Sequence, residues 1–477
     1  MSLRIISLLF VFITAAFSQN HYPDLFKLIH EGKFTEANKS IVGLLSGNPS
    51  PEQVYEIRFA GDLMNRIKLD FRKKSEDVIP FIKKYYPKVT AKQISEWEEH
   101  KDLEYKIMDG EKFYFNQAAR NLFRVNTDAK QVMVQKDGPE QDNLEDFLRI
   151  NIPAVIRDNN FSHEKKVHPV VMELDYTVSV KRGVVPAGEI IRCWMPFPRV
   201  NAGIQKNIEL VSVNDPEYIL APDNYLHSSV YLEKPALSDT ETVFNIKFKF
   251  TSYSEFNGIS FTKESAGKYD LPDLEKFISE RPPHIVFTSR IKKLSESIIG
   301  SEKDPVIKAK KIYDWINDNI PWASAREYST VPNISDYVLE NLHGDCGMQT
   351  LLFMTLCRYN GIPAQWQSGW MLHPGSVNLH DWCRINLPGY GWVPVDMSYG
   401  RQPFEADREK YFFFGNNDSY HMVVNDEYSA DFYPAKIYPR SETVDFQRGE
   451  VEWKGGNLYF DKWNYSMDVK YIDENEK

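Results

Sequence analysis

The chain of 477 residues contains only four cysteines: Cys193, Cys346, Cys357 and Cys383. Small disulfide-bonded domains have a far higher density of cysteine, so this chain does not depend on a disulfide framework. A structural zinc site needs closely spaced ligand pairs. The tightest pair here, His380 and Cys383, lies in an expected strand, where residues three apart point to opposite faces. We therefore expect no zinc centre.

Positive charge is also scarce. The chain has 57 lysine and arginine residues against 67 aspartate and glutamate residues, a net charge of −10. This balance argues against binding to nucleic acid or to an anionic membrane surface. No acidic loop has the regular ligand spacing of a calcium site, and we expect neither a metal nor a cofactor. Beyond the N-terminus no apolar run could span a bilayer, so stable membrane insertion is not expected.

The first 18 residues have the features of a secretory signal peptide. Arg4 is the positive charge, residues 5–12 form the apolar core, and Ala16-Phe17-Ser18 supplies small residues for cleavage. A buried N-terminal helix is the alternative, but polar residues begin abruptly at Gln19. No cysteine follows to carry a lipid anchor. We expect an exported protein, either periplasmic or extracellular.

The hydrophobic pattern of the first third of the chain is helical. Apolar residues recur at helical spacing from Leu25 to Leu44, and a second helical stretch is expected from Ala91 to about Leu122. No second copy follows at a fixed period, which argues against a repeat protein. Residues 19–150 are therefore assigned to an ordinary helical domain.

The period changes to two after this domain, which predicts an antiparallel β-sandwich over residues 165–255. Helices return after a proline-rich segment, and a series of strands follows them, so residues 285–425 form a third domain. Residues 426–477 are expected to be a short, β-rich C-terminal extension. The whole chain is thus predicted to be an α+β protein of several domains.

Cys346 lies in Gly344-Asp345-Cys346-Gly347, directly before an apolar run that predicts a buried helix. The thiol is therefore expected at a helix N-terminus, where the dipole and the free N–H groups favour a thiolate. The alternative is an inert cysteine of the core, which is the commoner case for this residue type. The flanking glycines and the position at the helix tip favour a reactive thiol.

Two further residues complete a possible reactive group. His380 opens one expected strand, Asp396 closes the next, and the turn Pro388-Gly389-Tyr390-Gly391 joins the strands. Closing this hairpin brings His380 and Asp396 together. A thiol, an imidazole and a carboxylate can serve as nucleophile, base and orienting group. The alternatives are a strand-edge histidine and an aspartate of a strand-end turn; His421 is interpreted as structural.

Together these motifs resemble the transglutaminase-like superfamily, relatives of papain-type cysteine proteases, in its secreted bacterial form. The matching pieces are the Gly-Asp-Cys-Gly segment with its apolar helix, His380-Asp381-Trp382-Cys383, Gly391-Trp392-Val393-Pro394-Val395-Asp396 and Phe414-Gly415-Asn416-Asn417-Asp418. The resemblance extends from about Ile285 to Val424 and implies a papain-like core. The helical domain and the sandwich carry no motif of equal specificity.

The resemblance also implies a mechanism. Cys346 would attack an amide carbonyl, His380 would take the thiol proton and return it to the leaving amine, and Asp396 would orient the imidazole. The oxyanion would need a side-chain donor besides the backbone N–H of Cys346, and Trp322 is the candidate, with Tyr328 as a second possibility. Core packing at a helix end is the alternative for Trp322.

The sequence thus predicts an exported cysteine enzyme that acts on peptides or proteins. Water is the default acyl acceptor in dilute surroundings, so we expect a peptidase or amidase rather than a cross-linking enzyme. Transfer of protein glutamine groups to amines remains an alternative. A catalytically silent binding or assembly module on the same fold is the other.

Overall fold

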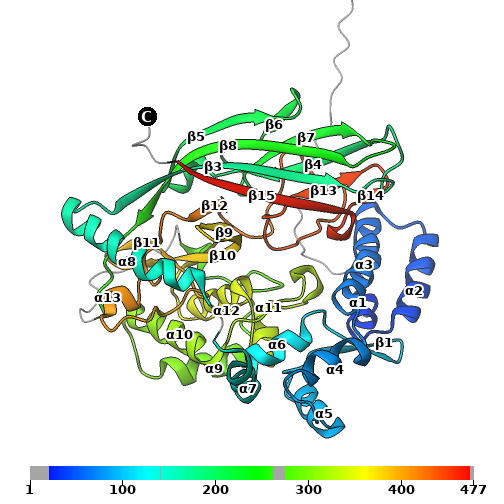
Figure 1. Cartoon of the computed structure of the whole chain (residues 1–477). Coiled ribbons are helices and arrows are strands. Elements are labelled where there is room, and N and C mark those ends of the chain that lie inside the picture. The colour runs from blue at the N-terminus through cyan, green and yellow to red at the C-terminus, as the bar shows by residue number, and fades with distance from the viewer. Residues whose placement is uncertain (1–20, 140, 262–273, 473–477) are drawn as a thin grey trace, which may run out of the picture.

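The computed structural model describes residues 21–139, 141–261 and 274–472. The expected signal peptide lies outside the described residues. Within them, the structure combines helices with four antiparallel sheets (Figure 1), which confirms the expected α+β class. A search of the described helices for one with the length and hydropathy of a membrane span finds none.

The N-terminal part is built around one core of helices, centred on Ile29, Ile67 and Leu122. Ser50 and Thr90 begin two of these helices with capping boxes, in which a hydroxyl and a glutamine side chain satisfy backbone N–H groups. The helices are α1 (Pro23–His30), α2 (Phe34–Ser46), α3 (Pro51–Asp70), α4 (Ser75–Lys83), α5 (Ala91–Glu99), α6 (Ala118–Val125) and α7 (Thr127–Asp137).

The continuous helical stretch expected from Ala91 to about Leu122 is wrong in its middle. Strands β1 (Tyr105–Met108) and β2 (Glu111–Tyr114) form an antiparallel hairpin there. Asp109 and Gly110 make the turn, with φ values of 47° and 88°. An Asp-Gly pair adopts this left-handed backbone readily and is a strong hairpin signal, which here outweighs the helical spacing of the neighbouring apolar residues.

A long helix, α8 (Asn143–Ser162), connects the helical part to the rest of the chain. It runs beyond the boundary expected at residue 150. Leu148, Ile152 and Val155 are buried on its inner face, where they form a small core with Phe412 and Phe413. The helix therefore packs on the third part of the chain, although it follows the helical domain in sequence.

Two antiparallel sheets form the predicted sandwich, the upper layer in Figure 1. Inward residues of β3 such as Leu174, Tyr176 and Val178 are fully buried, in keeping with period-two alternation. One sheet has the order β15 (Trp463–Ile472), β3 (Lys166–Val180), β8 (Thr242–Glu255), β5 (Gln205–Val213). The other has the order β14 (Gly456–Asn457), β13 (Glu450–Trp453), β4 (Ile190–Pro196), β7 (Ser229–Pro235), β6 (Tyr218–Leu220).

The C-terminal residues complete this sandwich. Strand β15 pairs with β3 along its full length, from Trp463 opposite Val180 to Ile472 opposite Val171. Strand β13 pairs with β4 in the other sheet. The strands within residues 426–472 belong to the two sheets of the sandwich and do not form a separate sheet. Pairing over such a sequence distance leaves no local signal in the pattern.

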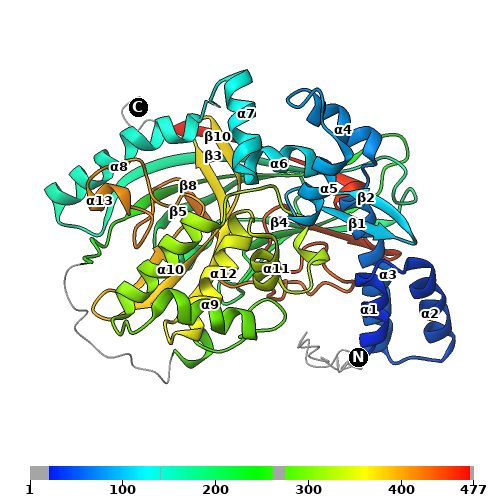
Figure 2. The ribbon, with the colours of Figure 1, turned by 90° about the horizontal axis from the view of Figure 1, so that it is seen from below.

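The third part packs helices against a sheet of order β11 (Gly391–Val395), β10 (Ser376–Leu387), β9 (Ala364–His373), β12 (His421–Asn425). Helix α12 (Cys346–Tyr359) lies between α10 (Pro305–Asn319) and α11 (Ile334–Asn341) in both views (Figures 1 and 2). Every residue from Gly347 to Arg358 is buried. The short helices α9 (Ser289–Ile299) and α13 (Asp407–Lys410) lie at the periphery.

Strand β15 should be important for stability because its first residue anchors it in the core. Trp463 is 3% exposed, and its indole N–H donates to the Leu458 carbonyl at 2.8 Å. We predict that Trp463→Ala lowers the free energy of unfolding by about 3–5 kcal/mol. The matched control is Tyr465→Ala on the same strand, where the side chain is 39% exposed and a loss below about 1 kcal/mol is expected. Equal losses in denaturant unfolding would contradict this.

Candidate active site

Cys346 is the first residue of α12, as predicted. Asp345 precedes it as the N-cap, and its carboxylate accepts the N–H of Met348 at 3.1 Å. This cap ends the chain's extended run and fixes the direction of the helix. All four cysteines are free; Cys346 is partly exposed, whereas the other three are buried. Cys346, at the helix tip, is therefore the least buried of the four.

His380 and Asp396 meet as the predicted hairpin implies. His380 lies in β10, Asp396 follows β11, and His380 Nε2 is 2.5 Å from Asp396 Oδ2 in a buried setting. The other oxygen of Asp396 accepts the backbone N–H groups of Ser398 at 3.0 Å and Tyr399 at 3.1 Å. The ring of Tyr399 stacks on the imidazole of His380, with centroids 4.8 Å apart. These contacts hold the imidazole in one orientation.

The hydrogen-bonded group extends to three further residues, among them His421, which the sequence analysis interpreted as structural. His421 lies between two carboxylates, with Nε2 3.0 Å from Asp396 Oδ2 and Nδ1 2.8 Å from Asp418 Oδ1. Asp418 also accepts from His373, whose Nε2 is 2.8 Å from Oδ2. His373 and His421 are completely buried. A continuous chain of imidazoles and carboxylates therefore runs inward from His380.

Charge is distributed unevenly along this chain. Burial alone would lower the pKa of His421, but its hydrogen bonds to Asp396 and Asp418 outweigh burial and raise that pKa to about 9. Burial alone would raise the pKa of Asp396, but His380 and His421 hold it well below its usual range. His421 is therefore an imidazolium at neutral pH, between two ionised carboxylates.

The same side chains form two clusters of residue types that can bind a metal ion. One consists of His373, Asp418 and His421, and the other of His380, Asp396 and His421. In both groups the candidate ligand atoms already hydrogen bond to one another. We interpret the set as a hydrogen-bonded chain that supports His380.

The thiol of Cys346 makes a contact that differs from the expected one. Its Sγ donates to Asp381 Oδ2 at 3.6 Å, and within the described residues no hydrogen bond joins it to His380. Burial raises the pKa of the thiol, and the carboxylates of Asp381 and Asp345 raise it further. The thiolate expected from the helix dipole is therefore wrong for this arrangement, because nearby negative charge and burial outweigh the dipole.

The two oxyanion candidates differ in their surroundings. Trp322 is 45% exposed, with the guanidinium of Arg124 over its ring at 5.0 Å; its indole N–H makes no hydrogen bond to any residue the structure describes. Its backbone runs beside Gly344, two residues before the nucleophile. Tyr328 lies closer to the chemistry, since its hydroxyl is 2.8 Å from Asp345 Oδ1 and 3.1 Å from Asp381 Oδ2. The role of Trp322 stays a prediction.

The helical domain holds the segment that carries these two residues. Asp70 at the end of α3 accepts the hydroxyl of Thr330 at 2.8 Å. Asn121 of α6 both donates to the carbonyl of Ser324, at 2.8 Å, and accepts its N–H, at 3.1 Å. The N-terminal domain thus supports one wall beside Cys346 through side chains that cap a loop.

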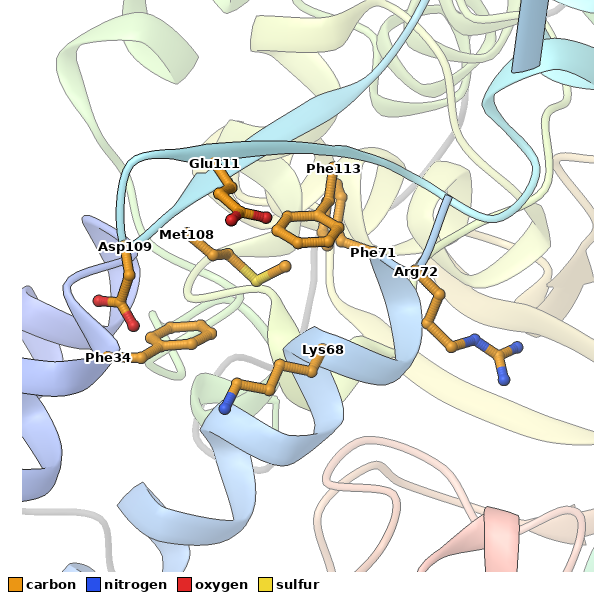
Figure 3. Close-up of a pocket in the computed structure, with 8 residues that line it drawn as sticks. All are labelled: Phe34, Lys68, Phe71, Arg72, Met108, Asp109, Glu111 and Phe113. Carbon is orange, nitrogen blue, oxygen red and sulfur yellow. The ribbon is translucent and has the colours of Figure 1, made fainter. Parts of the chain in front are cut away.

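A surface cavity of about 420 Å³ lies elsewhere, within the helical domain. Figure 3 shows Phe34, Met108 and Phe113 around it, whereas the guanidinium of Arg72 points away. All of its lining residues come from α2, α3 and the segment around the β1–β2 hairpin, and they include no thiol or imidazole. This cavity is therefore not the candidate site for the chemistry.

Comparison with known proteins assigns the segment that carries these residues. The family model of the transglutaminase-like superfamily matches residues 292–397, which include Cys346, His380 and Asp396. This segment is a transglutaminase-like domain. An uncharacterized protein of Haemophilus influenzae is 25% identical over 200 residues, 34% of this chain and 53% of the relative. The chain thus spans about half the length of that relative.

Three solved structures are also similar. One, described as "a Putative Cysteine Protease from Cytophaga hutchinsonii", has a TM-score of 0.43 and 15% identity, over 65% of this chain and 92% of that one. The periplasmic domain of TgpA from Pseudomonas aeruginosa has a TM-score of 0.26 and 15% identity, over 50% of this chain and 90% of that one. A "putative protease" from Parabacteroides distasonis has a TM-score of 0.21 and 14% identity, over 45% of this chain and 47% of that one. These similarities are too low to bear on function.

The imidazolium of His421 should make stability depend on pH. Its pKa is about 9 in the folded protein against 6.5 for the free side chain, so the stabilisation is fully present below pH 6.5 and is lost as pH rises through 9. We predict that His421→Gln lowers the free energy of unfolding by more at the acidic end of this window than at the alkaline end. The two losses should differ by on the order of 3 kcal/mol.

Denaturant unfolding of both proteins across this window measures the difference. His100→Gln is the matched control, because His100 is exposed at the end of α5 and its loss should change stability equally at each pH. A gap between wild type and His421→Gln that does not vary with pH would show that His421 is neutral.

Proposed function

We propose that the protein is an exported cysteine enzyme that cleaves or transfers amide bonds through a thioacyl intermediate, most readily as a peptidase or amidase. Cys346 is the proposed nucleophile, His380 the general base and Asp396 the residue that orients it. One observation carries the proposal: Cys346, partly exposed at the start of a buried helix, lies beside a strand whose histidine is 2.5 Å from a buried carboxylate.

The proposed reaction begins with transfer of the thiol proton from Cys346 to His380. The sulfur attacks the amide carbon, and the backbone N–H of Cys346 donates to the oxygen that becomes negative. As the C–N bond breaks, His380 returns the proton to the amine, which leaves. Water then attacks the thioester while His380 takes its proton, and Cys346 is released with its proton restored.

The hydrogen-bonded series of side chains behind His380 suits this proposed catalytic cycle. The imidazole must alternate between neutral and cationic forms, and an ionised Asp396 stabilises the cation. His421 on the far side of Asp396 keeps that carboxylate ionised and holds it in place. A base held in this orientation needs little reorganisation when it accepts the proton.

Hydrolysis and amine transfer share the first half of this cycle. Water is abundant at any partly exposed thiol, and no described group near Cys346 forms a recognisable site for a second, amine substrate. The peptidase or amidase activity is therefore the first proposal and transfer the second. Export is proposed from the composition of the first 18 residues.

We predict that Cys346→Ala lowers turnover of an amide substrate by about 10³-fold or more, because removal of the nucleophile leaves only binding and electrostatic assistance. The measurement is a screen of peptide and amide substrates with release of the amine detected. Cys357→Ala is the control, since it makes the same change at a buried position of the same helix. Equal turnover by wild type and Cys346→Ala would remove the proposal.

A second experiment decides the acyl acceptor. With water as the acceptor, a labelled primary amine added to the reaction should not appear in a glutamine-bearing protein, whereas the free acid of the substrate should accumulate. Mass spectrometry of both products measures the partition between them. Incorporation of the label that depends on Cys346 would replace the hydrolytic assignment with amine transfer.

A further inference from the structure

A second carboxyl group contacts the sulfur of Cys346. Asp381 follows His380 in β10 and is 2% exposed. Its Oδ2 lies 3.6 Å from Sγ and 3.1 Å from the hydroxyl of Tyr328. Its Oδ1 accepts from Gln447 Nε2 at 2.6 Å, and the same amide donates to the carbonyl of His380 at 2.7 Å. Both oxygens are therefore held, and the carboxyl is aimed at the thiol.

The first turn of α12 leaves little space beside this carboxyl. A Cβ atom added to Gly347 would lie 2.6 Å from Asp381 Oδ2 and 2.2 Å from the Tyr328 hydroxyl. Both distances are shorter than a normal contact, so only glycine fits after the nucleophile. The first turn of α12, Tyr328 and β10 enclose the carboxyl and keep it against the sulfur.

The charges that face Asp381 come from three directions. Asp345 caps α12, Tyr328 shares its hydroxyl between Asp345 and Asp381, and Glu442 and Asp445 lie on the segment before β13. On its own strand, His380 is the adjacent residue. Arg448, a cation that acts on Glu442 and Asp445, is 2.9 Å from Glu327.

This environment favours the neutral form of the Asp381 carboxyl. Burial raises the pKa of Asp381, and the negative charge of Asp345 raises it further, against the hydrogen bonds from Tyr328 and Cys346. Burial likewise raises the pKa of Asp345, to about 6. Two acids and a thiol that interact so closely titrate together and not as separate groups.

We propose that ionisation of Asp381 gates the nucleophile: the carboxylate holds the proton on Cys346, and the neutral acid instead donates a hydrogen bond to the thiolate. When Asp381 takes one proton from solvent, its O–H turns to the sulfur and the thiol proton passes to His380. The charge of the Cys346–Asp381 pair is −1 in both states, so the pair itself gains no charge. The catalytic consequence rests on the proposed function, but the coupling between the two groups does not.

The test is the rate of alkylation of Cys346 by iodoacetamide as a function of pH, with the labelled cysteine located by mass spectrometry. Replacing the carboxylate by an amide in Asp381→Asn should lower the pKa of the thiol by about one unit or more, and so speed alkylation at neutral pH about tenfold. Asp175→Asn, a change at a sandwich carboxylate, is the control and should leave the rate profile unchanged. Superimposable profiles for wild type and Asp381→Asn would overturn the proposal.

A reciprocal measurement remains decisive if Asp381→Asn does not fold, which circular dichroism would show. The thiol donates to the Asp381 carboxylate, so Cys346→Ala should raise the pKa of Asp381, read from the carboxyl bands of an infrared titration. An unchanged carboxyl pKa would overturn the proposal. Neither measurement requires turnover. If Cys346→Ala lost amide cleavage while the alkylation profiles of wild type and Asp381→Asn coincided, the proposed function would stand and the proposed role of Asp381 would be excluded.

Discussion

The register of the β10–β11 hairpin is the constraint on which the site depends. Leu387 opposite Gly391 closes the turn, and Cys383 opposite Val395 is the last pair before Asp396. A slip of one residue would turn the side chains of one strand to the other face of the sheet, and Asp396 would no longer face His380. The same sheet continues through β9 to β12, which brings His421 to the opposite side of Asp396.

The site contains two sets of acids with different partners, one behind His380 and one in front of it. Behind His380, the imidazolium of His421 stabilises Asp396 and Asp418 as carboxylates. In front of it, Asp345 and Asp381 face the sulfur, and burial drives both toward the neutral form. Two sets of buried acids therefore differ in protonation because only one set has histidine partners. This contrast separates the group that orients the base from the groups that affect the nucleophile.

Local patterns were enough to predict much of this structure. The apolar run after Cys346 indicated the buried helix, and the strands on either side of Pro388-Gly389-Tyr390-Gly391 indicated the meeting of His380 with Asp396. Asp381 was within a recognised motif but was not singled out, and His421 was interpreted as structural, because their importance comes from contacts with Cys346 and Asp418 that only the fold creates. The β1–β2 hairpin could have been found from its Asp-Gly turn, whereas the partners of β13 and β15 had no signal in the local sequence.

The pairing of β15 with β3 has a consequence for the order of assembly. Residues 181–462, which include Cys346, His380 and Asp396, lie between these two partners in sequence. Contacts of such long range form slowly and late. A nascent chain therefore keeps an open sheet edge beside β3 until residues 463–472 are synthesised, and the core cluster that buries Trp370 of β9 and Met422 of β12 is completed only then.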